Sequence, residues 1–190
     1  MPGKIVLFMS VSLDGYIEAE GHDISWHRVD EDLHRHFNEE LAAMGRFVSG
    51  RRTHMLMVDY WPAVGADPDS TPVEREFAEI WRSTPKTVYS TTLERADWNT
   101  TVVSRVDPDE VRALAAASDG DLALSGATLV HAFRERDLID AYQIYVHPVV
   151  VGRGTPLFAP TDTQVGLRLD RTRSFSNGVV LLRYEREGRP

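Results

Sequence analysis

The chain has 190 residues, no cysteine and a formal net charge of −8, from 21 basic and 29 acidic side chains. Without cysteine there are no disulfides, no thiolate zinc sites and no cysteine nucleophile. The acidity argues against broad nucleic-acid binding, and no apolar run reaches the length of a membrane span. We therefore expect one cytoplasmic domain over residues 1–190 that acts on a small molecule.

The first part of the chain alternates predicted strands with predicted helices. Residues 4–11 form a nearly continuous apolar run, which is typical of a strand buried on both faces. Apolar residues at spacings of four, four and three then predict an amphipathic helix from about Asp30 to Gly45. A short strand follows and ends at Gly50, and the next helix begins directly after it.

The middle of the chain opens with a segment rich in prolines, glycine and acids, which predicts a surface loop over residues 59–72. A helix begins at the end of this segment, because Thr71 is a good N-cap and Pro72 fits the first helical position. Glu74 completes a capping box there. Two strands and another capped helix are predicted next, at 87–90, 100–103 and 107–117.

The last third begins with a short apolar strand at 121–124, which runs through Gly126 into a helix. A longer strand follows at 141–147. Asn177-Gly178 fits a two-residue hairpin turn with positive φ and predicts an antiparallel pair of strands. This order of elements predicts an α/β fold of three layers, α-β-α, around a mixed sheet. The sheet is expected to be mainly parallel, with an antiparallel C-terminal hairpin.

Three loops at strand ends have compositions that suit phosphate groups. At Gly126 a strand turns into a helix, and the unpaired N–H groups of that helix point at any anion above the strand end. Gly50–Thr53 places two arginines beside a helix start, and Ser90–Thr92 places three hydroxyls after a buried strand. Each loop alone is also explained by an ordinary chain reversal or a solvated turn. Their common place at one edge of a parallel sheet favours a shared nucleotide site.

A second set of candidates consists of carboxylates that could help to protonate a bound ring. These are Asp14, after the first strand, and Asp30, Glu31 and Asp32, at the start of the first helix. Acids at a helix start also serve as caps, and that alternative stays open. The histidines are scattered without metal-ligand spacing, so we expect no metal site. The motifs of P-loop enzymes, serine hydrolases and ordinary dinucleotide-binding folds are absent from the sequence.

Several of these segments, in their order along nearly the whole chain, resemble the dihydrofolate reductase-like superfamily. The chain is most similar to the C-terminal reductase domain of the bifunctional riboflavin-biosynthesis deaminase/reductase. Ser125 stands where that family often has a glycine before Gly126, and the zinc deaminase half is missing, so the deaminase activity is not expected. The segments that carry the resemblance are 11–17, 50–53, 88–93, 125–129 and 149–158.

The resemblance implies that NADPH lies across the C-terminal edge of the sheet. It also implies which residues hold each part of the cofactor. The 2′-phosphate side and part of the diphosphate would be held by Gly50, Arg51, Arg52 and Thr53, and the adenosine ribose and phosphate by Ser90, Thr91 and Thr92. The diphosphate would be bound by Ser125, Gly126, Ala127, Thr128 and Leu129. The nicotinamide would be flanked by Ser10, Val11 and Ile17.

The expected function is an NADPH-dependent reductase of a pyrimidine- or pterin-like molecule. The resemblance makes 5-amino-6-(5-phosphoribosylamino)uracil, an intermediate of riboflavin synthesis, the first candidate substrate, and dihydrofolate the second. A nucleotide- or flavin-binding module without catalysis is the alternative from another class. Members of this branch commonly pair as homodimers, and the long apolar strand expected over 141–151 suits such an interface. A buried central strand explains that apolar run equally well.

Overall fold

The computed structural model describes residues 3–162 and 164–188, which form two sheets. The strands are β1 (Ile5–Ser12), β2 (Tyr16–Ala19), β3 (Arg46–Gly50), β4 (Lys86–Tyr89), β5 (Thr100–Val103), β6 (Leu122–Ser125), β7 (Ala141–His147), β8 (Gly154–Pro156), β9 (Leu167–Ser174) and β10 (Val180–Arg186). The main sheet has eight strands in the order β5-β4-β3-β6-β1-β7-β10-β9, and β2 pairs with β8 in the second sheet. The strands from β5 to β7 in this order run parallel, whereas β10 is antiparallel to β7 and β9.

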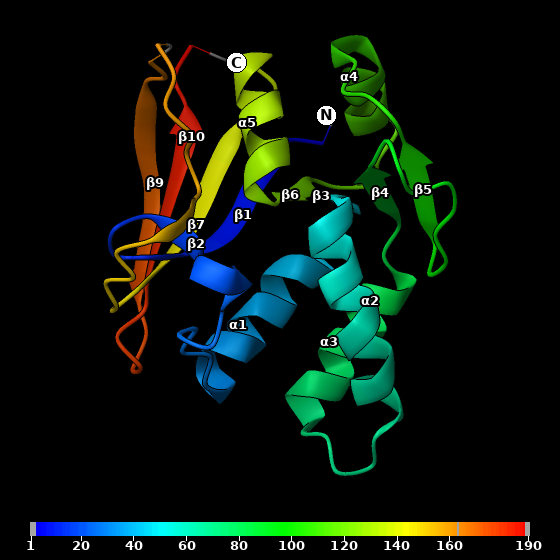
Figure 1. The fold of residues 1–190 in the computed structure, drawn as a ribbon, viewed down its shortest axis with the longest axis vertical. Helices are drawn as coiled ribbons and strands as arrows, with labels where there is room; N and C mark the ends of the chain where they lie inside the picture. The colour runs from blue at the N-terminus through cyan, green and yellow to red at the C-terminus, as the bar shows by residue number, and fades with distance from the viewer. Residues whose placement is uncertain (1–2, 163, 189–190) are drawn as a thin grey trace.

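Helices lie on both faces of the main sheet (Figure 1). They are α1 (Glu31–Ala42), α2 (Arg51–Ala66), α3 (Pro72–Ser83), α4 (Pro108–Ala116) and α5 (Ala127–Glu135), with a short 3-10 helix η1 (Glu20–His22). α4 and α5 pack on one face, α1 packs on the other, and α3 packs against α1 and α2. The predicted three-layer α/β fold with a mainly parallel mixed sheet is therefore confirmed. Over the described residues, no helix is both long enough and apolar enough to cross a membrane.

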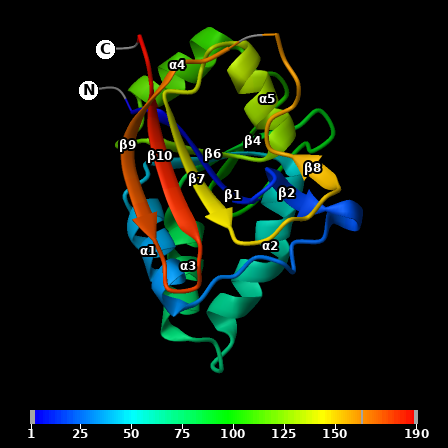
Figure 2. The same ribbon diagram turned by 90° about the vertical axis from the view of Figure 1, so that its left-hand side faces the viewer.

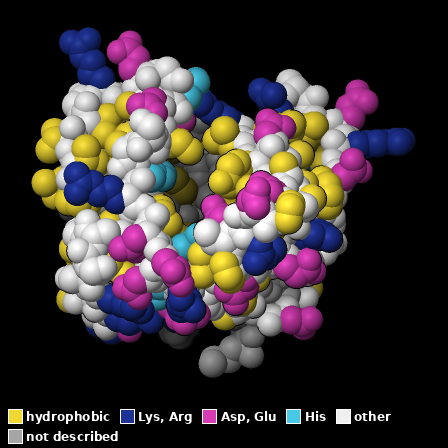
Figure 3. Space-filling view, turned by 90° about the horizontal axis from the view of Figure 1, so that it is seen from below, with side chains coloured by type: hydrophobic (Ala, Val, Ile, Leu, Met, Phe, Trp, Pro, Cys, Tyr) yellow, Lys and Arg dark blue, Asp and Glu magenta, His cyan; other side chains and the backbone are white. Residues whose placement is uncertain are grey.

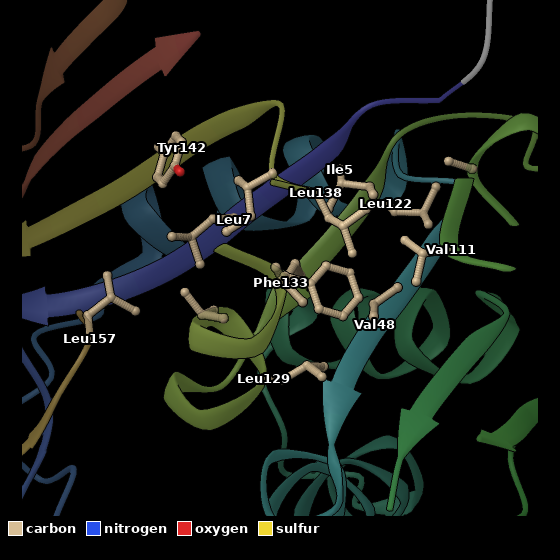
Figure 4. Close-up of a cluster of buried hydrophobic side chains, with 14 of the residues drawn as sticks. Ile5, Leu7, Val48, Val111, Leu122, Leu129, Phe133, Leu138, Tyr142 and Leu157 are labelled. Atoms are coloured by element: carbon tan, nitrogen blue, oxygen red, sulfur yellow. The ribbon is translucent and has the colours of Figure 1, made fainter. Parts of the chain in front are cut away.

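Strand β1 lies at the centre of the core and is buried on both faces. Ile5 and Leu7 belong to a cluster that Val111 of α4 and Phe133 of α5 complete, as Figure 4 shows. Val6, between them in sequence, points to the opposite face and joins a separate cluster. Each fully buried side chain of this size stabilises the fold by about 1.5–3 kcal/mol. The nearly continuous apolar run of β1 follows from these two covered faces.

Helix α2 corrects the prediction of a surface loop over residues 59–72. The helix continues across most of this segment, with Pro62 inside it. Trp61 packs edge-on against Phe77 of α3, with the ring centroids 4.3 Å apart. Packing of this kind outweighs the backbone hydrogen bond that a proline removes from a helix, so the composition alone was misleading.

The C-terminal hairpin is confirmed, but its turn is longer than predicted. The N–H of Phe175 donates to the carbonyl of Val179, which leaves a three-residue loop in which Gly178 alone has positive φ, of 87°. This is the geometry of a turn followed by a left-handed glycine. The long apolar strand expected over 141–151 is also shorter in the structure, because β7 ends at His147.

One part of the main sheet carries no helix. Among the described residues, no helix lies over β7, β10 and β9 on the face of the sheet opposite α1 (Figure 2). Ile144 of β7 pairs with Leu182 of β10, and both are half-buried there. Leu169 of the edge strand β9 is 52% exposed. This apolar area, formed by Ile144, Val146, Leu169, Leu182 and Tyr184, is called the open sheet face below.

Candidate functional site

A cleft of about 800 Å³ opens at the C-terminal ends of the central parallel strands and continues between α1, α2 and α3. Its lining includes Met9 of β1, Gly50 at the end of β3 and Gly126 just after β6. Seen from below, the molecule is hollowed near its centre, with hydrophobic and histidine side chains at the hollow (Figure 3). In open α/β sheets, ligands bind in the crevice at this edge.

Gly126 leaves the backbone bare at the base of this cleft. Its φ is +92°, and a Cβ atom there would lie 2.8 Å from Thr53 Oγ1 and 4.0 Å from the backbone nitrogen of Gly50. A side chain at this position would therefore be strained and would collide with Thr53. The turn between β6 and α5 thus stays open where it adjoins the start of α2.

The first turns of α2 and α5 lie side by side because β3 and β6 are parallel neighbours. Their N-caps, Gly50 and Gly126, supply no side chain to bind the first-turn N–H groups. Thr53, Ala127 and Thr128 line the cleft beside them. Free N–H groups at the positive end of a helix dipole bind anions, and two such ends together suit a diphosphate.

Glu18 of β2 lies next to these helix starts, with its side chain only 9% exposed. Its Oε2 is 3.2 Å from a terminal nitrogen of Arg52, and its Oε1 accepts a 2.6 Å hydrogen bond from Thr155 Oγ1. Burial alone would raise the pKa of Glu18, but the bonds from Thr155 and His22 and the charge of Arg52 outweigh burial and lower the pKa. Glu18 is therefore ionised at neutral pH and holds Arg52 at the edge of the cleft.

Beyond Glu18, the cleft is walled by apolar side chains, and this region is called the inner half below. Trp61 packs edge-on against both Phe77 and Tyr60, at centroid distances of 4.3 and 4.9 Å. At the mouth, Leu56 and Tyr60 remain 50% and 52% exposed. Exposed apolar side chains that continue into a cavity mark a ligand site. The other apolar residues of this half are Ile24, Val29, Phe37, Leu41 and Met57.

Two histidines and one carboxylate, His27, His34 and Glu74, also line the inner half. Burial lowers the pKa of His27 and of His34, and for His34 the charges of Glu74 and Glu76 oppose that effect. Glu74 belongs to the capping box of α3, where its Oε2 accepts hydrogen bonds from the Thr71 hydroxyl (2.7 Å) and the Thr71 N–H (2.8 Å). These two bonds lower the pKa of Glu74. At neutral pH the inner half therefore presents uncharged histidines and one carboxylate.

The structure brings together only part of the predicted cofactor site. The predicted residues that line the cleft are Ile17, Gly50, Arg52, Thr53, Gly126, Ala127, Thr128 and Leu129. Those that lie outside the lining are Ser10, Val11, Arg51, Ser90, Thr91, Thr92 and Ser125. The hydroxyl of Ser90 accepts the N–H groups of Thr92 and Leu93, at 3.2 and 2.9 Å, and so stabilises its own turn.

Asp14, predicted as a catalytic carboxylate, lies outside the cleft lining and binds backbone. It accepts N–H groups from Val151 at 3.0 Å and Gly152 at 2.7 Å. The Ser12 hydroxyl, together with these amides, lowers the pKa of Asp14 to about 2. A carboxylate that stays ionised to this pH is a poor proton donor, and its position indicates that it holds the loop after β7.

The three predicted carboxylates at the start of α1, Asp30, Glu31 and Asp32, also lie outside the cleft. Asp30 is the N-cap of α1 and accepts the N–H of Leu33 at 3.0 Å, which confirms the capping alternative. Asp30 and Glu31 line a smaller cavity of about 260 Å³, which shares His34 and Glu74 with the cleft. Over the described residues, no three histidine or acidic side chains come together to hold a metal ion.

Sequence reasoning missed Glu18, His34, Tyr60 and Trp61, all of which line the cleft. Glu18 carries no local signal, because its burial arises from the pairing of β2 with β8, far away in the chain. Tyr60 and Trp61 could have been found from the helical periodicity of the apolar residues in α2. The prolines and acids around them obscured this periodicity.

Known proteins share both the sequence pattern and the fold. The profile of the family described as RibD C-terminal domain matches residues 3–181. The uncharacterized protein YyaP of Bacillus subtilis (strain 168) is 32% identical over 186 residues, which cover 97% of this chain and 96% of that protein. The crystal structure of a putative riboflavin biosynthesis protein from Shewanella sp. PV-4 is 22% identical, with a TM-score of 0.74 over 98% of this chain and 99% of that one. Dihydrofolate reductase from Enterococcus faecalis, solved with NADP(H), is 17% identical, with a TM-score of 0.64 over 98% of each chain. The predicted dihydrofolate reductase-like fold is confirmed.

Proposed function

We propose, since the chain belongs to the family of RibD C-terminal domains, that it is an NADPH-dependent reductase of a small pyrimidine- or pterin-like molecule. The observation that supports this most is the meeting of two helix starts at Gly126, where bare backbone faces the cleft. The NADP(H) in the dihydrofolate reductase of the same fold also supports the choice of cofactor.

For the cofactor, we assign the diphosphate to the first turns of α2 and α5 and the 2′-phosphate to Arg52. Gly126 fits this role because a Cβ atom would fill the space between the two helix starts. When bound, NADPH supplies the hydride for the reduction. Of the predicted cofactor contacts, we retain those that line the cleft.

For the acceptor, we assign the inner half of the cleft. Trp61, Tyr60 and Phe77 offer flat apolar surfaces against which a planar ring can be oriented. These walls also exclude water from the bound ring, and orientation with water exclusion is most of what a protein contributes to hydride transfer. The acceptors to test first are 5-amino-6-(5-phosphoribosylamino)uracil and dihydrofolate, each beside a counterpart that lacks the phosphate or the glutamate tail.

The experiment is a NADPH oxidation assay with each acceptor, beside thermal melts with NADPH, NADH and FMN. Because a ligand that binds only the folded state raises the melting temperature, we expect NADPH to stabilise the protein and to be oxidised when an acceptor is present. Stabilisation by NADPH without turnover on any pyrimidine or pterin would instead support a nucleotide-binding module. Stabilisation by FMN alone would contradict the proposed cofactor.

Arg51 and Arg52 form a matched pair for testing the cofactor. Both side chains are exposed, but Arg52 alone of the two lines the cleft. We expect Arg52→Leu to weaken NADPH binding about tenfold and NADH binding little, because a charge-assisted contact to the extra phosphate is lost. Arg51→Leu is the control and should leave both dissociation constants unchanged. Equal losses for NADPH and NADH would contradict the role assigned to Arg52.

We also propose that two copies of the chain pair through the open sheet face. The half-buried side chains of Ile144, Leu182 and Tyr184 form one continuous apolar strip there, next to the exposed Leu169. An apolar sheet face without a helix is covered most simply by a second copy related by two-fold symmetry. The homodimers implied by the family resemblance support this choice.

A further inference from the structure

We infer that the inner half of the cleft selects acceptors by charge, and takes a neutral or protonated planar heterocycle that carries no phosphate and no carboxylate. The inference rests on the proposed function and narrows its acceptor. It argues against both of the acceptors first considered, since one carries a phosphate and the other a glutamate tail.

The first support is the set of cationic side chains in the cleft. Among the described residues that line it, Arg52 is the only lysine or arginine. Arg52 lies at the helix starts, where its guanidinium is 3.2 Å from Glu18. The inner half therefore offers a phosphate no arginine or lysine, although such groups are normally bound by charge-assisted hydrogen bonds from these side chains.

The second support is the negative charge at the inner end. Glu74 lines both the cleft and the smaller adjoining cavity, and Asp30 and Glu31 line the smaller cavity. Only Oε2 of Glu74 takes part in the two capping bonds to Thr71, and its Oε1 is not used by them. His34 lines both cavities with Glu74, and it is uncharged at neutral pH because burial lowers its pKa. A second anion in this apolar space would be repelled and poorly hydrated.

Two arginines on the neighbouring elements are engaged elsewhere. Arg35 of α1 pairs with Glu31 at 2.5 Å, and neither Arg35 nor Arg75 of α3 lines the cleft. Arg75 donates to the backbone carbonyls of Pro68 and Ser70, in the connection before α3. These contacts hold both guanidinium groups away from a bound acceptor.

The third support is the kind of surface that the walls present. Trp61 and Tyr60 line the cleft, and aromatic side chains there can contact a flat heterocycle, with or without a positive charge on it, through ring stacking or cation–π contact. Glu74 can accept hydrogen bonds from amino groups at the ring edge. A planar amino-heterocycle satisfies both features without an anionic group.

The test compares ligands that differ in one anionic group. Riboflavin is paired with FMN, and 6-hydroxymethylpterin with 6-carboxypterin, and each is titrated by calorimetry into wild-type protein saturated with NADP⁺. We expect the uncharged pterin to bind at least about tenfold tighter than its charged partner, and riboflavin to bind tighter than FMN. Equal or tighter binding of the charged pterin overturns the inference, and so does the failure of the uncharged pterin to bind.

A gain-of-function variant makes the test independent of any loss of folding. Leu56 lines the cleft on α2 and is 50% exposed, so that a longer side chain fits there. We expect Leu56→Arg to raise the affinity for the carboxylated pterin, relative to that for the uncharged pterin, about tenfold over the wild-type ratio. Leu56→Gln, of similar length without charge, is the matched control and should leave the ratio of the two affinities at its wild-type value. A raised ratio in both variants, or in neither, contradicts selection by charge.

A second variant removes the negative charge and keeps the helix cap. Glutamine also completes a capping box, so Glu74→Gln should retain α3 while it weakens the discrimination between the two pterins. Unchanged discrimination would show that Glu74 takes no part in it. The melt with NADPH alone separates the two proposals, because NADPH binding tests the reductase and the pterin pair tests the charge selection.

Discussion

At the scale of single residues, the proposed cofactor site depends on a position that has no side chain. Gly126 has a positive φ, and a Cβ atom added there would collide with Thr53. Comparison with Gly152 separates the backbone strain from this collision. Gly152 has a φ of +80°, but a Cβ atom there would meet nothing within 4 Å. The pair thus distinguishes backbone strain from loss of the space between the helix starts.

We expect Gly126→Ala and Gly152→Ala each to lower the free energy of unfolding by about 1–2 kcal/mol, the cost of a left-handed conformation with a Cβ atom. Only Gly126→Ala should also weaken NADPH binding, because its methyl group displaces Thr53 and narrows the cradle. Urea melts and NADPH titrations of both variants measure these effects. If Gly126→Ala bound NADPH with wild-type affinity, the assignment of the diphosphate to this turn would be contradicted.

Asp14 gives a test at acidic pH. Its pKa is lowered to about 2 in the folded protein, so the folded state binds this proton more weakly than the unfolded chain does. The stabilisation is therefore fully present above about pH 4 and is lost as the pH falls toward 2. In urea melts across this range, Asp14→Asn should be less stable than wild type above pH 4 and should approach it below. Turnover at neutral pH should persist, and its loss in a fully folded variant would restore Asp14 as a catalytic residue.

Residues that act through local chemistry were predictable, and residues placed by distant pairing were not. Gly126 and the helix starts follow from a strand–glycine–helix pattern that fixes backbone geometry within a few residues. The acid at Asp30 was correctly seen as ambiguous, and the structure shows it as a cap. Glu18 reaches the cleft only because β2 pairs with β8, a contact between segments more than a hundred residues apart. No local pattern encodes such a contact.

At the scale of elements, α2 serves both proposed ligands. Its first turn, with Arg52 and Thr53, lines the cofactor end of the cleft, and its later turns bring Tyr60 and Trp61 to the inner half. The prediction of a loop over residues 59–72 hid this second role, because prolines and acids dominate the composition there. The helix exists because its apolar side chains pack on α3, which is a tertiary effect.

The two roles of α2 separate in a single variant. We expect Trp61→Leu to raise the KM for the acceptor about fivefold to tenfold, since an aromatic contact worth about 1 kcal/mol is lost. The dissociation constant for NADPH should stay unchanged. Trp98→Leu is the control, because Trp98 is 37% exposed and does not line the cleft. A parallel loss of NADPH affinity in Trp61→Leu would show that α2 responds as one unit.

At the scale of the whole molecule, helices α4 and α5 cover only part of one sheet face. The strands β7, β10 and β9 extend beyond them and form the open sheet face (Figure 2). The cleft lies at the ends of β1, β3 and β6, near the middle of the same sheet. Pairing through the open sheet face would therefore use strands that supply little of the cleft.

Light scattering of two lysine variants tests this pairing. We expect Leu169→Lys to convert the proposed homodimer to a monomer, because a charge would be buried in an apolar interface. Leu13→Lys is the control, since Leu13 is 67% exposed and lies outside the open sheet face. A wild-type protein that is monomeric at all concentrations would contradict the proposed dimer.

The capping box of α3 has a consequence for how this cleft can change during evolution. Glu74 completes the capping box of α3 and also lines the cleft. Most replacements there would therefore shorten α3 as well as change which ligand the cleft binds. Leu56 and Tyr60 line the same cleft, yet about half of each side chain is exposed to solvent. New specificities should therefore arise by replacements on α2, while the wall formed by α3 stays as it is. A library for altering the acceptor is best built on these two positions.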